Sequence, residues 1–178
     1  GGEVVKMSTR KANYITLDEL KDEVGKDVVR YFFNMRNVNS HMIFDLAIAK
    51  KQSDENPVFY LQYAYARISS ILRRVQEEQL EVSINHLDLL LHEDEQALMK
   101  VLHNFKEEVL NSAENLETHK LCTYLYDLAS AYHRFNRSCR ILGTERLLAE
   151  ARLALAYATM IVIKNGLSIL GVSAQEQM

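Results

Sequence analysis

The sequence is poor in residues that interrupt helices or cross-link a chain. It has one proline, six glycines and two cysteines in 178 residues. Proline and glycine break or end helices, so their scarcity leaves room for long ones, and Gly25, Gly166 and Gly171 stand where helices are expected to end. Cys122 and Cys139 lie in a segment expected to be one helix, too far apart along it for a disulfide. This usage favours a reduced, cytoplasmic setting.

The sequence also lacks a strong charge bias and a signal peptide. Its formal net charge is -3, so any nucleic-acid surface must be local. No apolar run of membrane length is expected, and we predict no membrane association. With 48% hydrophobic residues, the chain can bury a sizeable core as one domain, or as one domain and part of another. Because it opens on Gly1 and Gly2, we expect a fragment of a longer protein.

Motifs for metal or covalent chemistry are missing as well. None of the six histidines pairs with another histidine or a cysteine at ligand spacing, and HEDEQ from His92 is not the HExxH zinc motif. No glycine-rich loop precedes a helix as in dinucleotide or P-loop sites. Cys139 lies on an apolar stripe, which favours core filling over nucleophilic catalysis. We therefore expect no metal site.

The first part of the chain predicts short elements. Thr16 and Glu19 have the spacing of a capping box, so a short helix is expected over residues 17–24. The apolar residues of 26–36 predict a second helix. After a loop, we expect a short strand at 42–44 and then a short helix.

A more regular pattern begins at Pro57, which suits a first helical turn because its missing N–H is not needed there. Apolar residues then recur at alternating three and four positions, as on one face of a helix. Segments 86–105 and 106–116 are amphipathic and of helical length. About five helices with short loops predict an all-α antiparallel bundle. The three clearest stripes are Val58, Leu61, Tyr65, Ile68, Leu72 and Val75; Leu121, Leu125, Leu128, Tyr132, Phe135, Cys139 and Leu142; and Leu148, Ala151, Leu155, Ala158 and Val162.

Arginines recur every three residues in the helix expected around the second stripe. Arg134, Arg137 and Arg140 therefore lie near one another, with aromatic neighbours such as Phe135. Such a face can bind phosphates and stack bases. Alternatively, it is a solvated face whose arginines pair with acidic residues such as Glu145. Composition favours this second interpretation, and the spacing leaves both open.

Several blocks, in order, resemble one family. KMSTR at 6–10, followed by NYITLDELKDEVGKDVVRYFF, resembles the KMSKS signature and downstream segment of class I aminoacyl-tRNA synthetases, in the variant of the arginyl-tRNA synthetases. The stretches FDLAIAKKQSDENPVFYLQYAYARISSIL (44–72) and AYHRFNRSCRIL (131–142) agree. The block 150–178 opens on EARL, which is similar to the DALR motif that names the family's helical anticodon-binding domain. The resemblance spans essentially the whole chain and implies that Met178 is its natural end.

The resemblance implies a loop that contacts ATP. In this family the loop places ammonium groups against the ATP phosphates as pyrophosphate leaves. Lys6, Met7 and Ser8 match the signature. Thr9 replaces its second lysine and offers only a hydroxyl hydrogen bond, which is weaker than a charged contact. Arg10, or the lysine that follows it, would have to supply the charge.

The resemblance also implies contacts to the anticodon stem and loop of tRNA, made by basic and aromatic residues of the bundle and by the C-terminus. Asn136 stands where relatives often have tyrosine, which removes a stacking surface worth about 1–3 kcal/mol per base. A partly buried ion pair is the alternative role for Arg67. The implied tRNA contacts are Gln62, Arg67, Asn136, Arg137, Arg140 and Met178.

The EARL motif is expected to be structural. It comprises Glu150, Ala151, Arg152 and Leu153, inside a helix expected to be packed in the bundle. At this position Arg152 is expected to hold helices together more than to contact a base.

By this resemblance, residues 1–53 end a class I catalytic domain and residues 54–178 form the DALR domain. Complete enzymes of the family ligate arginine to its tRNA with ATP and Mg²⁺. This chain lacks the Rossmann body and the HIGH motif, so alone it is expected to be inactive and to bind no cofactor. Arginine tRNA is the expected partner, with ATP and arginine bound only alongside the catalytic domain, and no DNA or membrane is expected.

Two other interpretations remain. One is a non-catalytic helical module that docks a partner protein through its apolar stripes. The other is the same region of another class I synthetase, such as a cysteinyl enzyme, which the blocks around Gln62 and the C-terminus argue against.

Overall fold

The computed structural model describes residues 14–178, and every regular element among them is helical. The predicted strand at 42–44 is wrong, because this stretch is an irregular segment in which Met42 and Phe44 pack against the core while Ile43 is exposed. Phe44 lies against Phe32 with 5.2 Å between ring centroids. The elements are α1 (Leu17–Val24), α2 (Lys26–Asn34), α3 (Leu46–Ala49), α4 (Pro57–Val75), the 3-10 helix η2 (Leu87–Leu89), α5 (Glu93–His103), α6 (Phe105–Asn115), α7 (Thr118–Ser138) and α8 (Arg146–Leu170).

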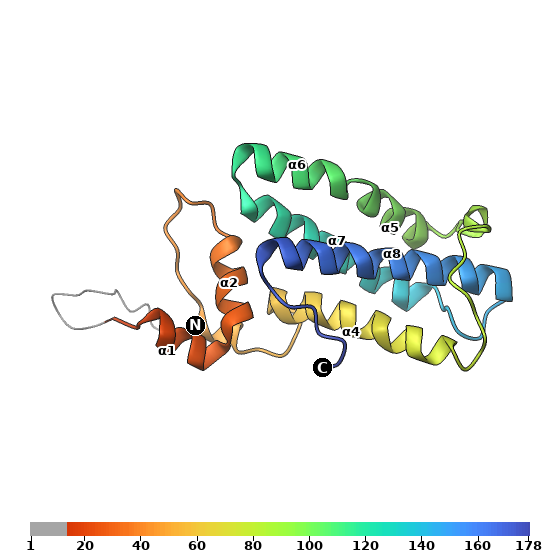
Figure 1. Ribbon diagram of the computed structural model, residues 1–178, viewed down its shortest axis with the longest axis horizontal. Coiled ribbons are helices and arrows are strands. Elements are labelled where there is room, and N and C mark those ends of the chain that lie inside the picture. Colours follow the sequence, from red (N-terminus) through yellow and green to blue (C-terminus); the bar gives the residue numbers. More distant parts are fainter. Residues whose placement is uncertain (1–13) are drawn as a thin grey trace.

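Helices α4 to α8 form a bundle (Figure 1). Helices α4 and α7 run in one direction, whereas α5, α6 and α8 run in the other. Only Asn104 separates α5 from α6, and the two together cover one side of α7. The all-α antiparallel bundle that the apolar periods predict is confirmed, with three shorter helices before it.

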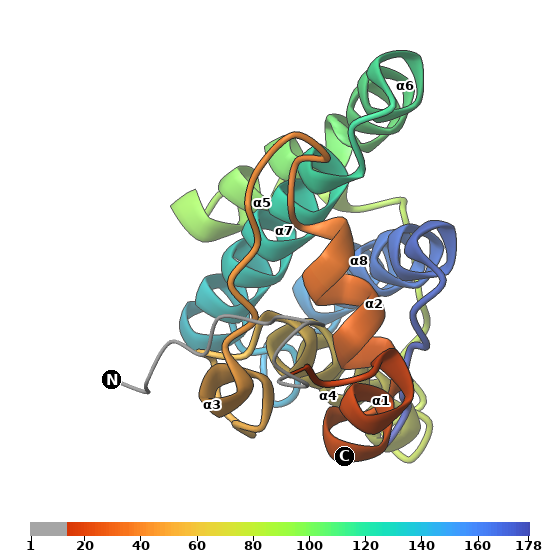
Figure 2. The ribbon, with the colours of Figure 1, turned by 90° about the vertical axis from the view of Figure 1, so that its left-hand side faces the viewer.

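The three short helices lie at one end of the bundle (Figure 2). Tyr31 of α2 is buried, and its hydroxyl donates to the Cys122 carbonyl of α7 at 2.9 Å. The Lys50 ammonium pairs with the Glu23 carboxylate at 2.6 Å and thereby connects the end of α3 to α1. Tyr31 thus fastens α2 to the bundle by a buried hydrogen bond.

The core forms where α4, α7 and α8 face one another. Leu61, Leu125 and Leu153, one from each helix, have no exposed surface. The third predicted stripe is only partly right, because Ala158 and Val162 are half-buried. Helix α8 contacts α4, α5 and α7 at once, so a broad face of it is buried instead of one stripe.

The sequence was expected to hold no apolar run of membrane length, and α8 corrects this. By length and composition alone, its 25 residues match a membrane span. Half of its most apolar window is buried within the structure. The apolar character therefore fits a helix at the centre of a bundle, which passes the same test.

Gly166 in α8 and Gly171 just after it have different structural roles. Gly166 lies inside the helix instead of ending it, and a Cβ there would lie 2.5 Å from Leu125 Cδ2 of α7. Its missing side chain therefore permits close approach of α7 and α8. The helix ends at Gly171, which adopts a left-handed φ of 69° as expected for a C-terminal glycine.

Side chains just before α1 and α4 cap these helices and so set where they begin. The predicted capping box at α1 is present, because the Glu19 N–H donates to Thr16 Oγ1 and the Thr16 N–H donates to the Glu19 carboxylate. At α4, the buried Asn56 accepts from the Val58 N–H at 3.1 Å while its amide donates to the carbonyls of Ala49 and Lys51. Asn56 thus fastens the α3 turn to the start of α4.

We expect Asn56→Ala to lower the free energy of unfolding by about 2 kcal/mol, because a lost cap costs about 0.5–2 kcal/mol and two carbonyls lose their donor. Urea unfolding followed by circular dichroism measures the change. Asn56→Ser is the control, since it keeps a capping oxygen and removes the amide donors without adding a charge. An alanine variant as stable as the serine variant would contradict the capping role.

Candidate nucleic-acid interface

A surface depression of ≈ 570 Å³ lies where α4 and α7 run side by side. Its lining combines rings and cations from both helices. On α4, Phe59, Tyr63 and Arg67 are four residues apart and therefore share a face. We call this lining the α4–α7 surface; it consists of Asp54, Phe59, Tyr60, Tyr63, Arg67, His133, Asn136 and Arg137.

The rings of the α4–α7 surface form a partly stacked series. Phe59 and Tyr63 are nearly parallel, at 6° and 6.1 Å between centroids. His133 lies 5.7 Å from Tyr63 at 22° and 4.4 Å from Tyr60. Because Tyr63 is 40% exposed, it presents an aromatic side chain to solvent on which an unstacked base can pack.

Two arginines supply the charge of this surface. Arg67 is exposed and its guanidinium donates to the Tyr63 hydroxyl at 3.2 Å. Within the described residues it makes no ion pair, so the buried ion pair considered for it does not form. Arg137, also exposed, lines the same depression from α7. Both guanidinium groups are therefore available to phosphate oxygens.

His133 contacts the rings of Tyr60 and Tyr63 and feels the charges of both arginines. Burial lowers the pKa of its imidazole below the ordinary value, and the charges of Arg67 and Arg137 lower it further. A contact of 3.4 Å with the Tyr60 carbonyl acts in the opposite direction. His133 is therefore neutral at pH 7 and serves as a ring, while the arginines carry the charge.

Three of the residues predicted to contact tRNA line this one depression: Arg67, Asn136 and Arg137. The prediction missed Phe59, Tyr60, Tyr63 and His133. The four-residue spacing of Phe59, Tyr63 and Arg67, on the face away from the apolar stripe, was a signal for Phe59 and Tyr63. Tyr60 and His133 gave no such signal.

Arg140 lies just beyond α7 and outside the depression. Its side chain is exposed, and its carbonyl accepts from the Arg152 guanidinium at 2.7 Å. Its neighbour Cys139 is buried, as is Cys122. Burial raises the pKa of Cys122 to about 12 and that of Cys139 to about 11, so both are unreactive thiols at neutral pH.

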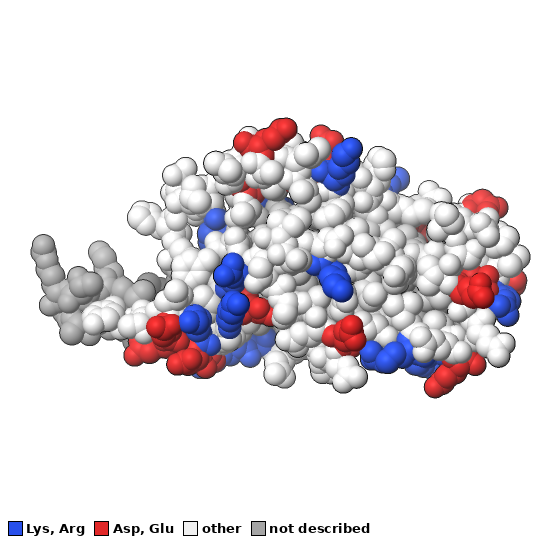
Figure 3. All heavy atoms as spheres, in the orientation of Figure 1, with Lys and Arg blue, Asp and Glu red and all other residues white. Residues whose placement is uncertain are grey.

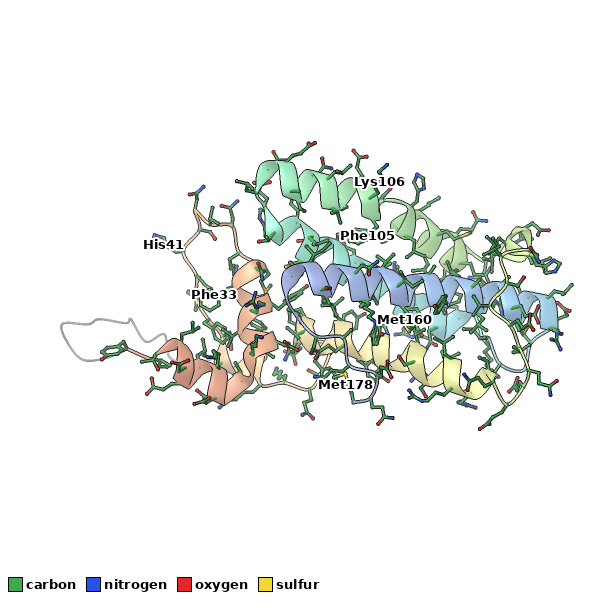
Figure 4. All side chains as sticks on the ribbon, viewed as in Figure 1. Phe33, His41, Phe105, Lys106, Met160 and Met178 are labelled. Atoms are coloured by element: carbon green, nitrogen blue, oxygen red, sulfur yellow. The ribbon has the colours of Figure 1, made fainter. Side chains whose placement is uncertain are left out.

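Gln62 and Met178 lie apart from the depression. Gln62 is 6% exposed, and its amide donates to the Ser173 carbonyl at 3.0 Å and to the Asp27 carboxylate at 3.3 Å. Gln62 therefore holds the segment that follows α8. Met178 is 55% exposed near α4, at the end of that segment (Figure 4).

The EARL motif lies inside α8, where Ala151 and Leu153 are fully buried. Arg152 pairs with the Glu95 carboxylate of α5 at 2.6 Å, and both side chains are largely withdrawn from solvent. Glu95 also accepts from the His92 N–H at 2.8 Å and so completes the capping box of α5. Arg152 thus joins α8, α5 and the loop after α7.

Glu150 also forms an ion pair, with Arg146 one turn earlier in α8. The Arg146 Nε lies 3.0 Å from the Glu150 carboxylate. That arginine is 60% exposed and also donates to the Gln79 carbonyl. The pair therefore joins an exposed guanidinium to a largely buried carboxylate.

The loop Lys6 to Arg10 lies outside the described residues. Within residues 14–178 there is no group of three or more His, Cys, Asp or Glu side chains that could hold a metal ion. On the described part of the face in Figure 3, basic and acidic side chains are interspersed and form no continuous basic area. Any charged interface on this face is therefore local.

Residues 61–178 match the family described as the DALR anticodon binding domain. The chain belongs to this family. The DALR match begins in the first turns of α4 and runs through α8 to the last residue, so it includes most of the α4–α7 surface. The division predicted at residue 54 stays a prediction.

Arginine–tRNA ligases are similar to this chain over its full length. The chain is 50% identical over 183 residues to the arginine–tRNA ligase of Salinibacter ruber and 49% identical over 181 residues to that of Carboxydothermus hydrogenoformans. Each alignment covers 100% of this chain and 32% of the relative. The chain thus spans about a third of the length of these relatives.

A solved structure of an arginyl-tRNA synthetase has the same fold over this region. The arginyl-tRNA synthetase of Thermus thermophilus superposes with a TM-score of 0.77 at 28% identity, over 96% of this chain and 29% of that one. The resemblance to the C-terminal region of arginyl-tRNA synthetases is confirmed.

Proposed function

We propose that this chain binds the anticodon stem and loop of an arginine tRNA through the α4–α7 surface. It does so as part of an arginine–tRNA ligase, a cytoplasmic enzyme that uses ATP and Mg²⁺. Arg140 and Met178 extend the contact at the end of α7 and at the C-terminus. Gln62 contributes by holding the C-terminal segment.

One observation carries this proposal: the exposed Tyr63 ring, with partly buried rings beside it, meets two guanidinium groups from α4 and α7 in one depression. Single-stranded loops are recognised by stacking on aromatic side chains and by cations on the backbone. The Tyr63 ring supplies the first of these, and Arg67 and Arg137 supply the second. The DALR family and the arginine–tRNA ligase relatives support the anticodon of arginine tRNA as the target.

The ATP part of the proposal rests on Lys6, Met7, Ser8, Thr9 and Arg10. Because these residues lie outside the described structure, no geometry supports a step on ATP. Alone, the chain should form no arginyl-tRNA, since the reaction also needs the catalytic domain.

A salt titration tests the interface. We expect the chain to bind arginine tRNA in filter-binding assays more tightly than a tRNA with an altered anticodon, with affinity falling as salt rises. In Arg67→Ala/Arg137→Ala, the slope of log affinity against log salt should shrink by about 1–2, as expected for two lost phosphate contacts.

Lys106→Ala provides the matched control, because Lys106 is exposed on α6 at the other side of the bundle (Figure 4). It removes a positive charge far from α4 and should leave the slope unchanged. Equal affinity for both tRNAs at low salt would refute the anticodon role.

A further inference from the structure

Helix α2 carries a polar face that meets the end of α8. Asp27, Arg30 and Asn34 lie on this face at helical spacing. The Asn34 amide donates to the Leu170 carbonyl at 3.4 Å. The Arg30 guanidinium lies so close to Gly171 that a Cβ there would come within 2.7 Å of it. Helix α2 is therefore fitted to the residues where α8 ends.

The next contact along the chain joins α2 to the segment after α8. The Ser173 N–H donates to Asp27 Oδ2 at 3.2 Å, and its hydroxyl donates to the same oxygen. The Ser173 carbonyl accepts from the buried Gln62 amide, which also reaches Asp27. We call Asp27, Gln62 and Ser173 the Asp27 clamp. All three polar groups of Ser173 are satisfied by it.

The Asp27 clamp joins three elements that are distant in sequence: α2, α4 and the C-terminal segment. Val172, just before it, is 4% exposed, and within residues 14–178 no hydrogen bond follows Ser173. The segment therefore crosses α4 at the clamp and ends at the exposed Met178 beside α4 (Figure 4).

We propose that Asp27 is a positioning residue for RNA binding: through Ser173 and Gln62 it fixes residues 172 and 173 beside α4, and so sets the point from which the last five residues lead Met178 to the tRNA. This inference rests on the proposed function. A carboxylate that accepts several hydrogen bonds makes strong ones, and a segment ordered in advance loses less entropy when it binds. Asp27 itself contacts no RNA in this scheme.

A double-mutant cycle separates positioning from a general structural role. We expect Asp27→Asn and Met178→Ala each to weaken tRNA binding about 3- to 10-fold, as ordering one or two side chains costs about 0.5–1.5 kcal/mol apiece. The double variant should bind no worse than either single variant. If Asp27 merely stabilised the fold, the two effects would multiply.

Asp22→Asn is the matched control, because Asp22 is exposed on α1 and its replacement also removes one negative charge. It should leave the affinity unchanged. A loss equal to that of Asp27→Asn would overturn the proposal.

Hydrogen exchange without RNA tests the clamp independently of the proposed function. Asp27→Asn and Ser173→Ala should both lose protection at the amide of residue 173 and near Val172, while α4 and α7 keep theirs. Unchanged protection there would overturn the clamp. If the two variants lose this protection but the wild-type chain binds no tRNA, the clamp stands. The proposed function, and the role of Met178 in it, would then be overturned.

Discussion

Replacing Arg152 with methionine should lower the free energy of unfolding by about 3–5 kcal/mol, because it leaves a buried carboxylate without its charged partner. Glu95 is 1% exposed and receives the Arg152 guanidinium at 2.6 Å. The Arg140 carbonyl loses a donor at the same time. Urea unfolding followed by circular dichroism measures the loss.

Two variants show whether the buried charge is the cause. Adding Glu95→Gln to Arg152→Met should recover much of the stability, since glutamine keeps an acceptor for the His92 N–H and removes the charge. Lys51→Met breaks the exposed pair between Lys51 and Glu55 and should cost less than about 1 kcal/mol. Equal losses in Arg152→Met and Lys51→Met would refute the buried-pair argument.

Removing the Tyr63 ring should weaken tRNA binding by about 5- to 150-fold, because stacking of one base on an aromatic side chain is worth about 1–3 kcal/mol. The Tyr63 side chain is exposed and lies nearly parallel to Phe59 and close to His133, so it is held ready to receive a base. Filter binding of arginine tRNA to Tyr63→Ala measures the effect.

Two further tyrosine variants serve as controls. Tyr63→Phe keeps the ring and loses only the hydroxyl that Arg67 contacts, so it should bind within about threefold of the wild type. Tyr157→Ala removes a tyrosine of similar exposure from α8 and should leave the affinity unchanged. If Tyr157→Ala weakened binding as much as Tyr63→Ala, general destabilisation would be the better explanation.

Local signals predicted much of the helical framework. The capping box at Thr16 and the proline at position 57 marked the starts of α1 and α4 correctly, because a cap and a first turn are set by residues a few positions apart. The strand at 42–44 failed for the opposite reason. Phe44 is apolar because Phe32 lies beside it, a contact that periodicity within one short segment does not reveal.

Only part of the candidate site was predicted, because local spacing and sequence blocks point to single residues and not to contacts between helices. Arg137 stood out by its spacing from neighbouring arginines, and the family resemblance pointed to Arg67 and Asn136. His133 gave no comparable signal, since it comes from a different helix than Tyr63 and lies 70 positions away from it. Their proximity depends on how α4 and α7 pack.

The sequence by itself determined that this chain forms long helices, that these pack into an antiparallel bundle, and that it resembles the C-terminal part of arginyl-tRNA synthetases. Each of these follows from short-range spacing or from ordered blocks of residues. Only the tertiary structure decided the partners: Glu95 for Arg152, Ser173 for Asp27 and Gln62, and His133 for Tyr63. Side chains that far apart in sequence meet only when helices pack, so their chemistry depends on the fold.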